Sequence, residues 1–137
     1  MSIVVPKKPK KQPKKKTLMK KADALWSLII RSGGNCEVSG EPTANAHHFI
    51  GRKNMRLRYD LANGVRLTYQ NHVGGKVSAH NDPMWFVGWF KTNRPDDYDY
   101  LEKAKHELVI TTAEWYYDNI QRLTRILKEM ENGLLYK

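Results

Sequence analysis

The stretch Ala46-His47-His48-Phe49-Ile50-Gly51-Arg52 is the most informative part of this chain, because it carries two adjacent histidines. Asn63 lies fifteen residues after His48, and His72 lies nine residues after Asn63. A neutral imidazole binds a divalent metal, and with a pKa near ~6.5 it can also take a proton from water. Since neighbouring side chains on a strand point to opposite sides, one ring of the doublet can reach a metal while the other reaches a water molecule beside it.

Arginines extend this pattern from metal chemistry to phosphate chemistry. Arg52, Arg56 and Arg58 lie between the doublet and Asn63, and Arg66 follows shortly after. The guanidinium group is always charged, and its fork of donors matches the oxygens of a phosphate. A pair of adjacent histidines alone arises often by chance, but the whole set suits metal-assisted cleavage of a phosphodiester.

The chain from residue 26 to residue 89 resembles an HNH endonuclease of the ββα-metal (His-Me finger) class, and is most similar to the small phage-encoded members. The matching segments are CEVSG at residues 36–40, AHHFIGR at 46–52, RYDLANGV at 58–65, and His72. The resemblance implies an α+β fold in which a small ββα-metal hairpin-helix motif is embedded in a mainly helical domain. The doublet would lie on the first strand, Asn63 at or near the second, and His72 on the short helix that follows.

The resemblance also implies a hydrolytic site with one divalent metal ion. His47 and His72 are expected to bind the ion, and His48 is expected to be the general base that deprotonates the attacking water. Asn63 is expected to keep His48 oriented. The residues expected to bind DNA phosphates are the arginines of the intervening loop, Arg52, Arg56 and Arg58.

The third protein ligand is open at this point. Relatives of the colicin type have another histidine four residues after the last motif histidine, where this chain has Lys76. His80 is the nearest substitute, and it completes the site if the chain folds back at Gly74-Gly75; otherwise water fills the place. Mg²⁺ is the expected ion, with Mn²⁺, Ni²⁺ or Zn²⁺ as alternatives.

One departure from the class concerns a structural zinc that many members hold on four cysteines. Cys36 is the single cysteine here, and Ser39, Thr68 and Asn71 occupy what look like the other three places. Hydroxyl and amide groups are poor zinc ligands, so no structural zinc on a four-cysteine cluster is expected, and Cys36 is expected to be a small buried residue. A single cysteine excludes an intrachain disulfide, which fits a reducing compartment.

The first 21 residues are predicted to form a disordered basic tail. They hold nine lysines, three prolines and no acidic residue, so the segment repels itself and has little apolar surface to bury. Because the whole chain carries +10, residues 22–137 carry only about +1. The positive charge is thus concentrated in part of the chain, and a basic side that binds DNA is expected. No secretion signal follows the charges and no stretch approaches the ~20 apolar residues of a membrane span, so no membrane partner is expected.

Residues 22–137 are predicted to form one nuclease domain with C-terminal helices. Helices are expected over residues 23–31, from 83 to a stop at 93–95 and from 96 or 97 to 107, with strands over 46–50 and 64–67. Beyond them, apolar residues recur in steps of four and three at Tyr116, Ile120, Leu123, Leu127, Met130 and Leu134. This heptad-like seam can pack on the body or pair two copies into a homodimer, and its short length favours the body.

A group of aromatic residues allows two interpretations as well. The group has helical spacing and consists of Trp85, Phe86, Trp89 and Phe90. Such residues can stack on bases, but the spacing is that of a buried helical stripe and favours the core.

The predicted function is a metal-dependent DNA endonuclease that nicks DNA or cuts both strands, in phage DNA processing or recombination. The alternative is a protein that binds nucleic acid without catalysis, on an HNH fold that has decayed. Loss of three zinc cysteines fits the alternative. Binding alone would not require the doublet, Asn63 and His72 together, so the enzyme is favoured. The protein is expected in the cytoplasm, that of the host cell if a phage encodes it.

Overall fold

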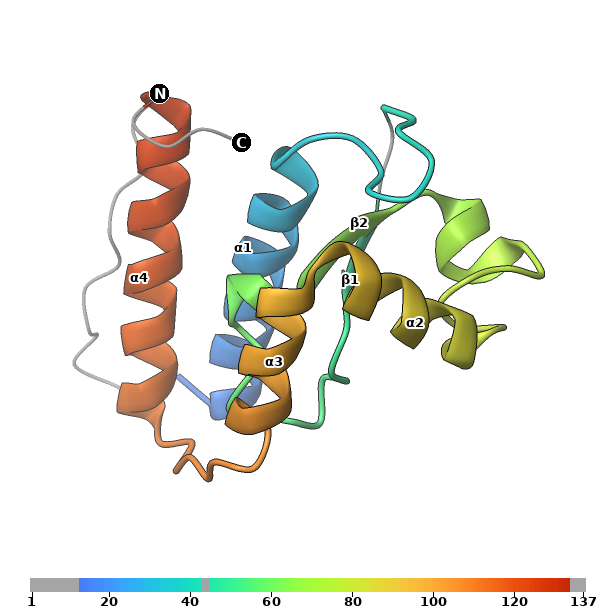
Figure 1. The fold of residues 1–137 in the computed structure, drawn as a ribbon. Helices are drawn as coiled ribbons and strands as arrows, with labels where there is room; N and C mark the ends of the chain where they lie inside the picture. Colours follow the sequence, from blue (N-terminus) through green and yellow to red (C-terminus); the bar gives the residue numbers. More distant parts are fainter. Residues whose placement is uncertain (1–12, 43–44, 134–137) are drawn as a thin grey trace.

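The computed structural model describes residues 13–42 and 45–133, which form a mostly helical α+β structure. The elements are the helices α1 (Lys15–Ser32), α2 (Pro83–Asn93), α3 (Pro95–Ala104) and α4 (Ala113–Glu131), and the strands β1 (Asn45–His48) and β2 (Gly64–Leu67). α1 and α4 lie side by side and run in the same direction, although most of the chain separates them in sequence (Figure 1). The predicted fold class is thus confirmed at the level of a small hairpin within a helical domain.

α1 begins at Lys15, so the predicted tail of 21 residues and the predicted domain start at residue 22 are wrong by seven residues. Leu18 and Ala22 lie one helical turn apart, and both are buried in the core that α1 shares with α4. The lysines of these turns are exposed. Burial of one apolar face therefore outweighs repulsion among the lysines, and residues 1–12 of the tail lie outside the described residues.

The hairpin is antiparallel, with His47 opposite Val65 and His48 opposite Gly64. The strand predicted over residues 64–67 is confirmed. The strand predicted over residues 46–50 is observed at Asn45–His48, so it begins one residue earlier and ends two residues earlier than predicted. A Cβ atom on Gly64 would collide with the side chain of Ile30. The glycine therefore lets the hairpin lie directly on α1, which brings the doublet beside that helix.

The seam of α4 packs inside the molecule. Four residues of the seam are buried with α1 in one core: Tyr116, Ile120, Leu123 and Leu127. Met130 packs at the edge of that core. Leu134 lies outside the described residues. Thr112 caps α4 by accepting a hydrogen bond from the Trp115 N–H. Because α1 covers this face, packing on the body is confirmed, and a homodimer would have to use another face of α4.

A second core joins β2 to α2 and α3. Phe86 and Phe90 are buried there and Trp85 and Trp89 pack at its edge, so the aromatic stripe is a core stripe as predicted. α2 runs from Pro83 to Asn93, as predicted, whereas α3 ends at Ala104, three residues before the predicted end. Within the described residues, no helix has the length and apolar character needed to cross a membrane.

Candidate metal centre

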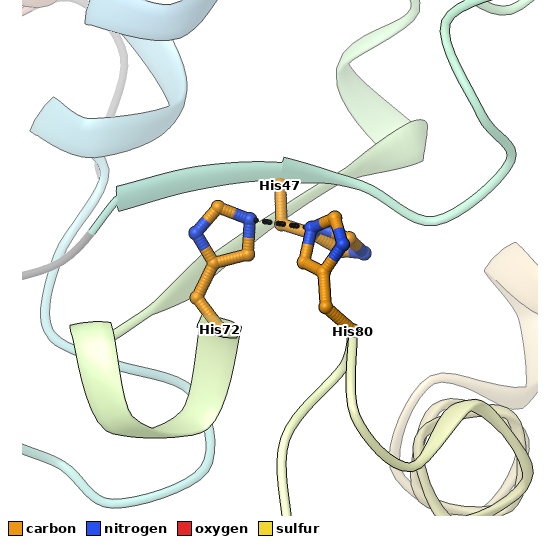
Figure 2. A group of neighbouring side chains, drawn as sticks. All are labelled: His47, His72 and His80. Atoms are coloured by element: carbon orange, nitrogen blue, oxygen red, sulfur yellow. Dashed lines mark hydrogen bonds between the residues drawn. The ribbon is translucent and has the colours of Figure 1, made fainter. Parts of the chain in front are cut away.

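Three histidines from different segments meet at one place (Figure 2). His47 lies on β1, His72 lies on a single π-helical turn (Gln70–Gly74), and His80 lies in the loop before α2. Their ligand nitrogens all lie within 4.8 Å of one another, and the Nε2 atoms of His72 and His80 are 3.1 Å apart. The structure therefore brings together the two residues that were expected to bind the ion, His47 and His72, and the candidate third ligand, His80.

The third histidine reaches the site because the chain folds back after the π-helical turn. The His80 N–H donates to the His72 carbonyl at 3.0 Å, and the Ala79 N–H donates to the Asn71 carbonyl at 2.8 Å. A Cβ atom on Gly75 would lie 2.7 Å from the Gln70 backbone carbonyl oxygen, so the tight turn favours glycine at this position. The fold-back on which the prediction for His80 depended is thus present.

His48 faces a different set of groups from its neighbour His47. Its ring stacks on the indole of Trp26, with centroids 3.8 Å apart and planes 8° from parallel. Its Nε2 lies 2.9 Å from the carbonyl oxygen of Arg58. Because a carbonyl only accepts, Nε2 carries the proton and Nδ1 keeps its lone pair. The ring is therefore fixed on two sides and retains one nitrogen that can accept a proton.

One pocket of about 490 Å³ contains both parts of the doublet. Its walls come from α1, from the hairpin and from the two following loops, and its lining residues are Asp23, Trp26, Ser27, Ala46, His47, His48, Gly51, Arg52, His72 and His80. The volume lies within the usual range for a ligand site. The three clustered histidines and the candidate base therefore share one cavity large enough for a small ligand.

Burial favours the neutral form of three histidines of this pocket by lowering the pKa of His47, His48 and His72. Burial and the neighbouring histidines lower the pKa of His47 to about 3. Burial, and to a smaller extent the charges of Arg58 and Arg52, lower the pKa of His48 to about 4. Burial also lowers the pKa of His72. Neutral imidazole is the form that binds a metal or accepts a proton, so the electrostatics suit both roles.

Asn63 is fully buried and is not part of the pocket wall. Its Oδ1 accepts from the Ile50 N–H at 2.7 Å, and its Nδ2 donates to the carbonyls of Ile50 at 2.8 Å and Leu57 at 3.1 Å. These bonds hold both ends of the segment that leads to the carbonyl of Arg58. The position is compatible with the expected orienting role, and it leaves Asn63 out of the pocket itself.

Two of the three arginines expected to bind phosphate are engaged elsewhere. The Arg58 guanidinium donates to both carboxylate oxygens of Asp23, at 2.8 and 2.7 Å. Arg56 forms an ion pair with Glu107 at 2.9 Å. Arg52 is exposed and lines the pocket. The structure therefore places Arg52 where a phosphate could reach it, and it does not support the prediction for Arg56 and Arg58, whose charges carboxylates compensate.

The four positions compared with the structural zinc site of HNH nucleases lie close together here, although only one of them is a cysteine. They are Cys36, Ser39, Thr68 and Asn71. Cys36 Sγ accepts from the N–H groups of Ser39 at 3.4 Å and Thr68 at 3.3 Å, and lies 3.7 Å from Asn71 Oδ1. Burial raises the pKa of the Cys36 thiol, but these hydrogen bonds together outweigh burial and lower it. Cys36 is buried, as predicted. A hydrogen-bonded cluster thus joins the turn before β1 to the turn that carries His72.

Sequence reasoning missed three residues of the pocket, Asp23, Trp26 and Ser27, all on α1. They precede the doublet by about twenty residues, and Trp26 has the spacing of an ordinary core residue. It is indeed only 2% exposed. Its place on the buried face of the helix was predictable, but nothing local to Trp26 indicates that a histidine stacks on it.

Comparison of the chain with protein-family models, with curated proteins and with solved structures gives no match. The function of the site is therefore argued from its own geometry.

Proposed function

We propose that this protein is a metal-dependent DNA endonuclease that hydrolyses phosphodiester bonds with one metal ion, as HNH nucleases do. The observation that carries the proposal is the division of the histidine doublet. His47 joins His72 and His80, while His48 is fixed separately in the same pocket. Hydrolysis of a phosphodiester needs such an arrangement, because the metal must contact the phosphate while a base reaches the attacking water.

Three imidazoles fit a transition metal ion. Metal–nitrogen bonds of about 2.1 Å place two ligands of one ion roughly 3.0 to 3.4 Å apart, and the Nε2 atoms of His72 and His80 are 3.1 Å apart. A small shift of the His47 ring would complete the set, since all ligand nitrogens lie within 4.8 Å. Imidazole suits Zn²⁺ and Ni²⁺ better than Mg²⁺, which prefers oxygen ligands. We therefore place Zn²⁺ or Ni²⁺ ahead of Mn²⁺ and of Mg²⁺, the ion expected from the sequence.

A divalent ion bound by these histidines supplies positive charge that neutralises the phosphate as it reacts. His48 accepts the proton of the attacking water at Nδ1, while its Nε2–H stays bonded to the Arg58 carbonyl. The lowered pKa keeps His48 deprotonated before substrate binds, and the negative phosphate raises that pKa toward neutrality as it enters. Arg52 holds an adjacent phosphate at the edge of the pocket.

Nicking of supercoiled plasmid DNA tests this proposal. The wild-type protein should nick the plasmid when Zn²⁺, Ni²⁺, Mn²⁺ or Mg²⁺ is supplied, and EDTA should stop the reaction. His48→Ala should lower the rate by ~10²-fold or more, as expected for a general base, while calorimetry still detects metal binding. His47→Ala should lose metal binding as well as activity. His106→Ala, at an exposed position outside the pocket, is the matched control.

Two results would contradict the proposal in different ways. A His48→Ala rate above about a tenth of the wild-type rate would exclude His48 as the base, given the ~10²-fold loss expected. A wild-type protein that binds DNA but nicks no plasmid with any of the four metals would favour the alternative, a nucleic-acid-binding protein without catalysis.

A further inference from the structure

One face of α1 continues from the histidine pocket toward both ends of the helix. Asp23 and Ser27 line the pocket. At 3.6 residues per turn, positions 16, 20, 23, 27 and 31 share one face of a helix. Lys16, Lys20 and Arg31 are exposed, and Arg31 Nε donates to Ser27 Oγ at 3.2 Å. A row of cations therefore passes the mouth of the pocket.

The positive charge of this row meets little opposition from the pocket wall. Asp23 is the one acidic residue of α1, and both its oxygens accept hydrogen bonds from the Arg58 guanidinium. Arg52, also on the pocket wall, adds another cation. A pocket edged by cations, with its one carboxylate already neutralised, attracts a polyanion more strongly than a neutral ligand.

We propose that this face of α1, formed by Lys16, Lys20, Ser27 and Arg31 and called here the phosphate face, binds the backbone of one nucleic-acid strand and leads it across the histidine pocket. Lys16 and Arg31 are fifteen positions apart, which is about 22 Å at ~1.5 Å per residue. That length matches roughly six nucleotides of one strand at ~3.4 Å each. The location of the scissile phosphate rests on the proposed function, whereas the binding surface rests on the charges of α1.

The phosphate face supplies what the intervening loop does not. Arg56 and Arg58 were expected to hold phosphates, but each is paired with a carboxylate of another segment. Moving either guanidinium to a phosphate would leave that carboxylate without its partner. The exposed lysines of α1 carry no such cost, so phosphate binding is assigned to the helix together with Arg52.

Two double variants that remove equal charge test the proposal. Lys16→Gln/Lys20→Gln takes two cations from the phosphate face. Lys15→Gln/Lys21→Gln takes two exposed lysines, which lie about 100° round the helix from Lys16 and Lys20, one on each side of the face. Gln has nearly the helix propensity of Lys, so both variants should keep the fold, which circular dichroism checks. Binding of a fluorescein-labelled DNA duplex is then measured in EDTA over a range of salt concentrations.

The slope of log K against log salt decides between the variants. We expect its magnitude to fall by about 1.8 in the phosphate-face variant, at ~0.9 per phosphate contact, and by less than half as much in the control. Equal losses in both variants, or no loss in either, would overturn the proposal, because binding would then depend on total charge or on another surface. The same measurement with a single strand of equal length shows which form of nucleic acid, duplex or single strand, gives the larger difference in slope between the two variants.

These measurements distinguish failure of the phosphate face from failure of the proposed endonuclease function. Because EDTA prevents metal-dependent cleavage, a protein that never nicks plasmid would still give the expected slopes if the phosphate face binds DNA. Conversely, a protein that nicks plasmid but gives equal slopes would keep its endonuclease function and lose the phosphate face.

Discussion

Trp26 links the proposed general base to the core of the protein. Its buried indole stacks on His48 at 3.8 Å, and its Nε1 donates to the Asp60 carbonyl at 3.0 Å. The plane of the His48 ring is therefore set by a core side chain, while the Arg58 carbonyl sets the rotation of the ring within that plane. Neither contact closes the side of the ring that carries Nδ1.

We predict that Trp26→Phe and Trp26→Leu separate the stacking role from core packing. Phe keeps a flat ring against His48, whereas Leu keeps apolar volume without a flat face. An aromatic contact contributes about 0.5–1.5 kcal/mol beyond its buried area, and ~1.4 kcal/mol is tenfold in rate. The kcat of plasmid nicking should therefore fall roughly 2- to 10-fold in the Leu variant and less in the Phe variant, with KM little changed. Equal kcat in both variants, measured well below each Tm, would show that the stack does not position His48.

At the residue scale, short-range spacing predicted more of the site than long-range pairing. The four histidines and Asn63 lie within one stretch of residues 47–80, so their spacing was readable in the sequence. Arg58 and its partner Asp23 are 35 positions apart, and Arg56 and Glu107 are 51 apart. An arginine in a polar loop looks the same in sequence whether it faces a phosphate or a carboxylate, so the pairing of these two guanidinium groups with carboxylates was not predictable.

Among the elements, α1 shows that the packing of one face can override composition. The lysine-rich start of this helix suggested a disordered tail, yet Leu18 continues the buried face of Ala22 and Trp26 at intervals of four residues. The remaining helices were predicted from apolar periodicity, and in the structure Thr112 caps α4 and Asp82 caps α2. Their ends were less certain, because side chains near a helix end are less constrained by packing.

The start of α1 can be tested with two identical substitutions on the same helix. Leu18 is 4% exposed and Leu28 is 39% exposed. We expect Leu18→Ala to lower the free energy of unfolding by about 2–4 kcal/mol through loss of buried surface and creation of a cavity. Leu28→Ala should cost less than about 1 kcal/mol. Urea unfolding measures both, and an equally small loss in the two variants would mean that the first turns of α1 lie outside the cooperative domain.

On the scale of the whole molecule, the hairpin separates two cores, and each core holds one member of the doublet. His48 stacks on Trp26 of the core shared by α1 and α4, whereas His47 contacts Phe86 of the core shared by β2, α2 and α3, with ring centroids 5.1 Å apart. The alternation of side chains along a strand predicted that the two rings would diverge. Which core each ring would join depends on the packing of helices distant in sequence, so it was not readable from the chain.

Because both rings contact a core, protons should affect the stability of the whole protein. Burial lowers the pKa of His47 to about 3 and of His48 to about 4, from an ordinary value of 6.5. Between pH 6.5 and about 4, the unfolded chain binds protons that the folded protein excludes. The free energy of unfolding should therefore fall as pH falls through this window, by up to ~1.4 kcal/mol per pH unit for each histidine. Above pH 6.5, neither histidine should make the free energy of unfolding depend on pH.

Replacing one ring isolates its contribution to this slope. His48→Gln removes a titrating group from the pocket without adding charge, so the slope below pH 6.5 should drop by up to ~1.4 kcal/mol per pH unit. His106→Gln, at an exposed position, should leave the wild-type slope unchanged. Urea unfolding in EDTA gives both slopes, and carboxylates titrate alike in the two variants, so the difference belongs to His48. If the slope survives His48→Gln, the pKa of His48 in the folded protein stays near its ordinary value, and burial in the pocket does not exclude the proton from this ring.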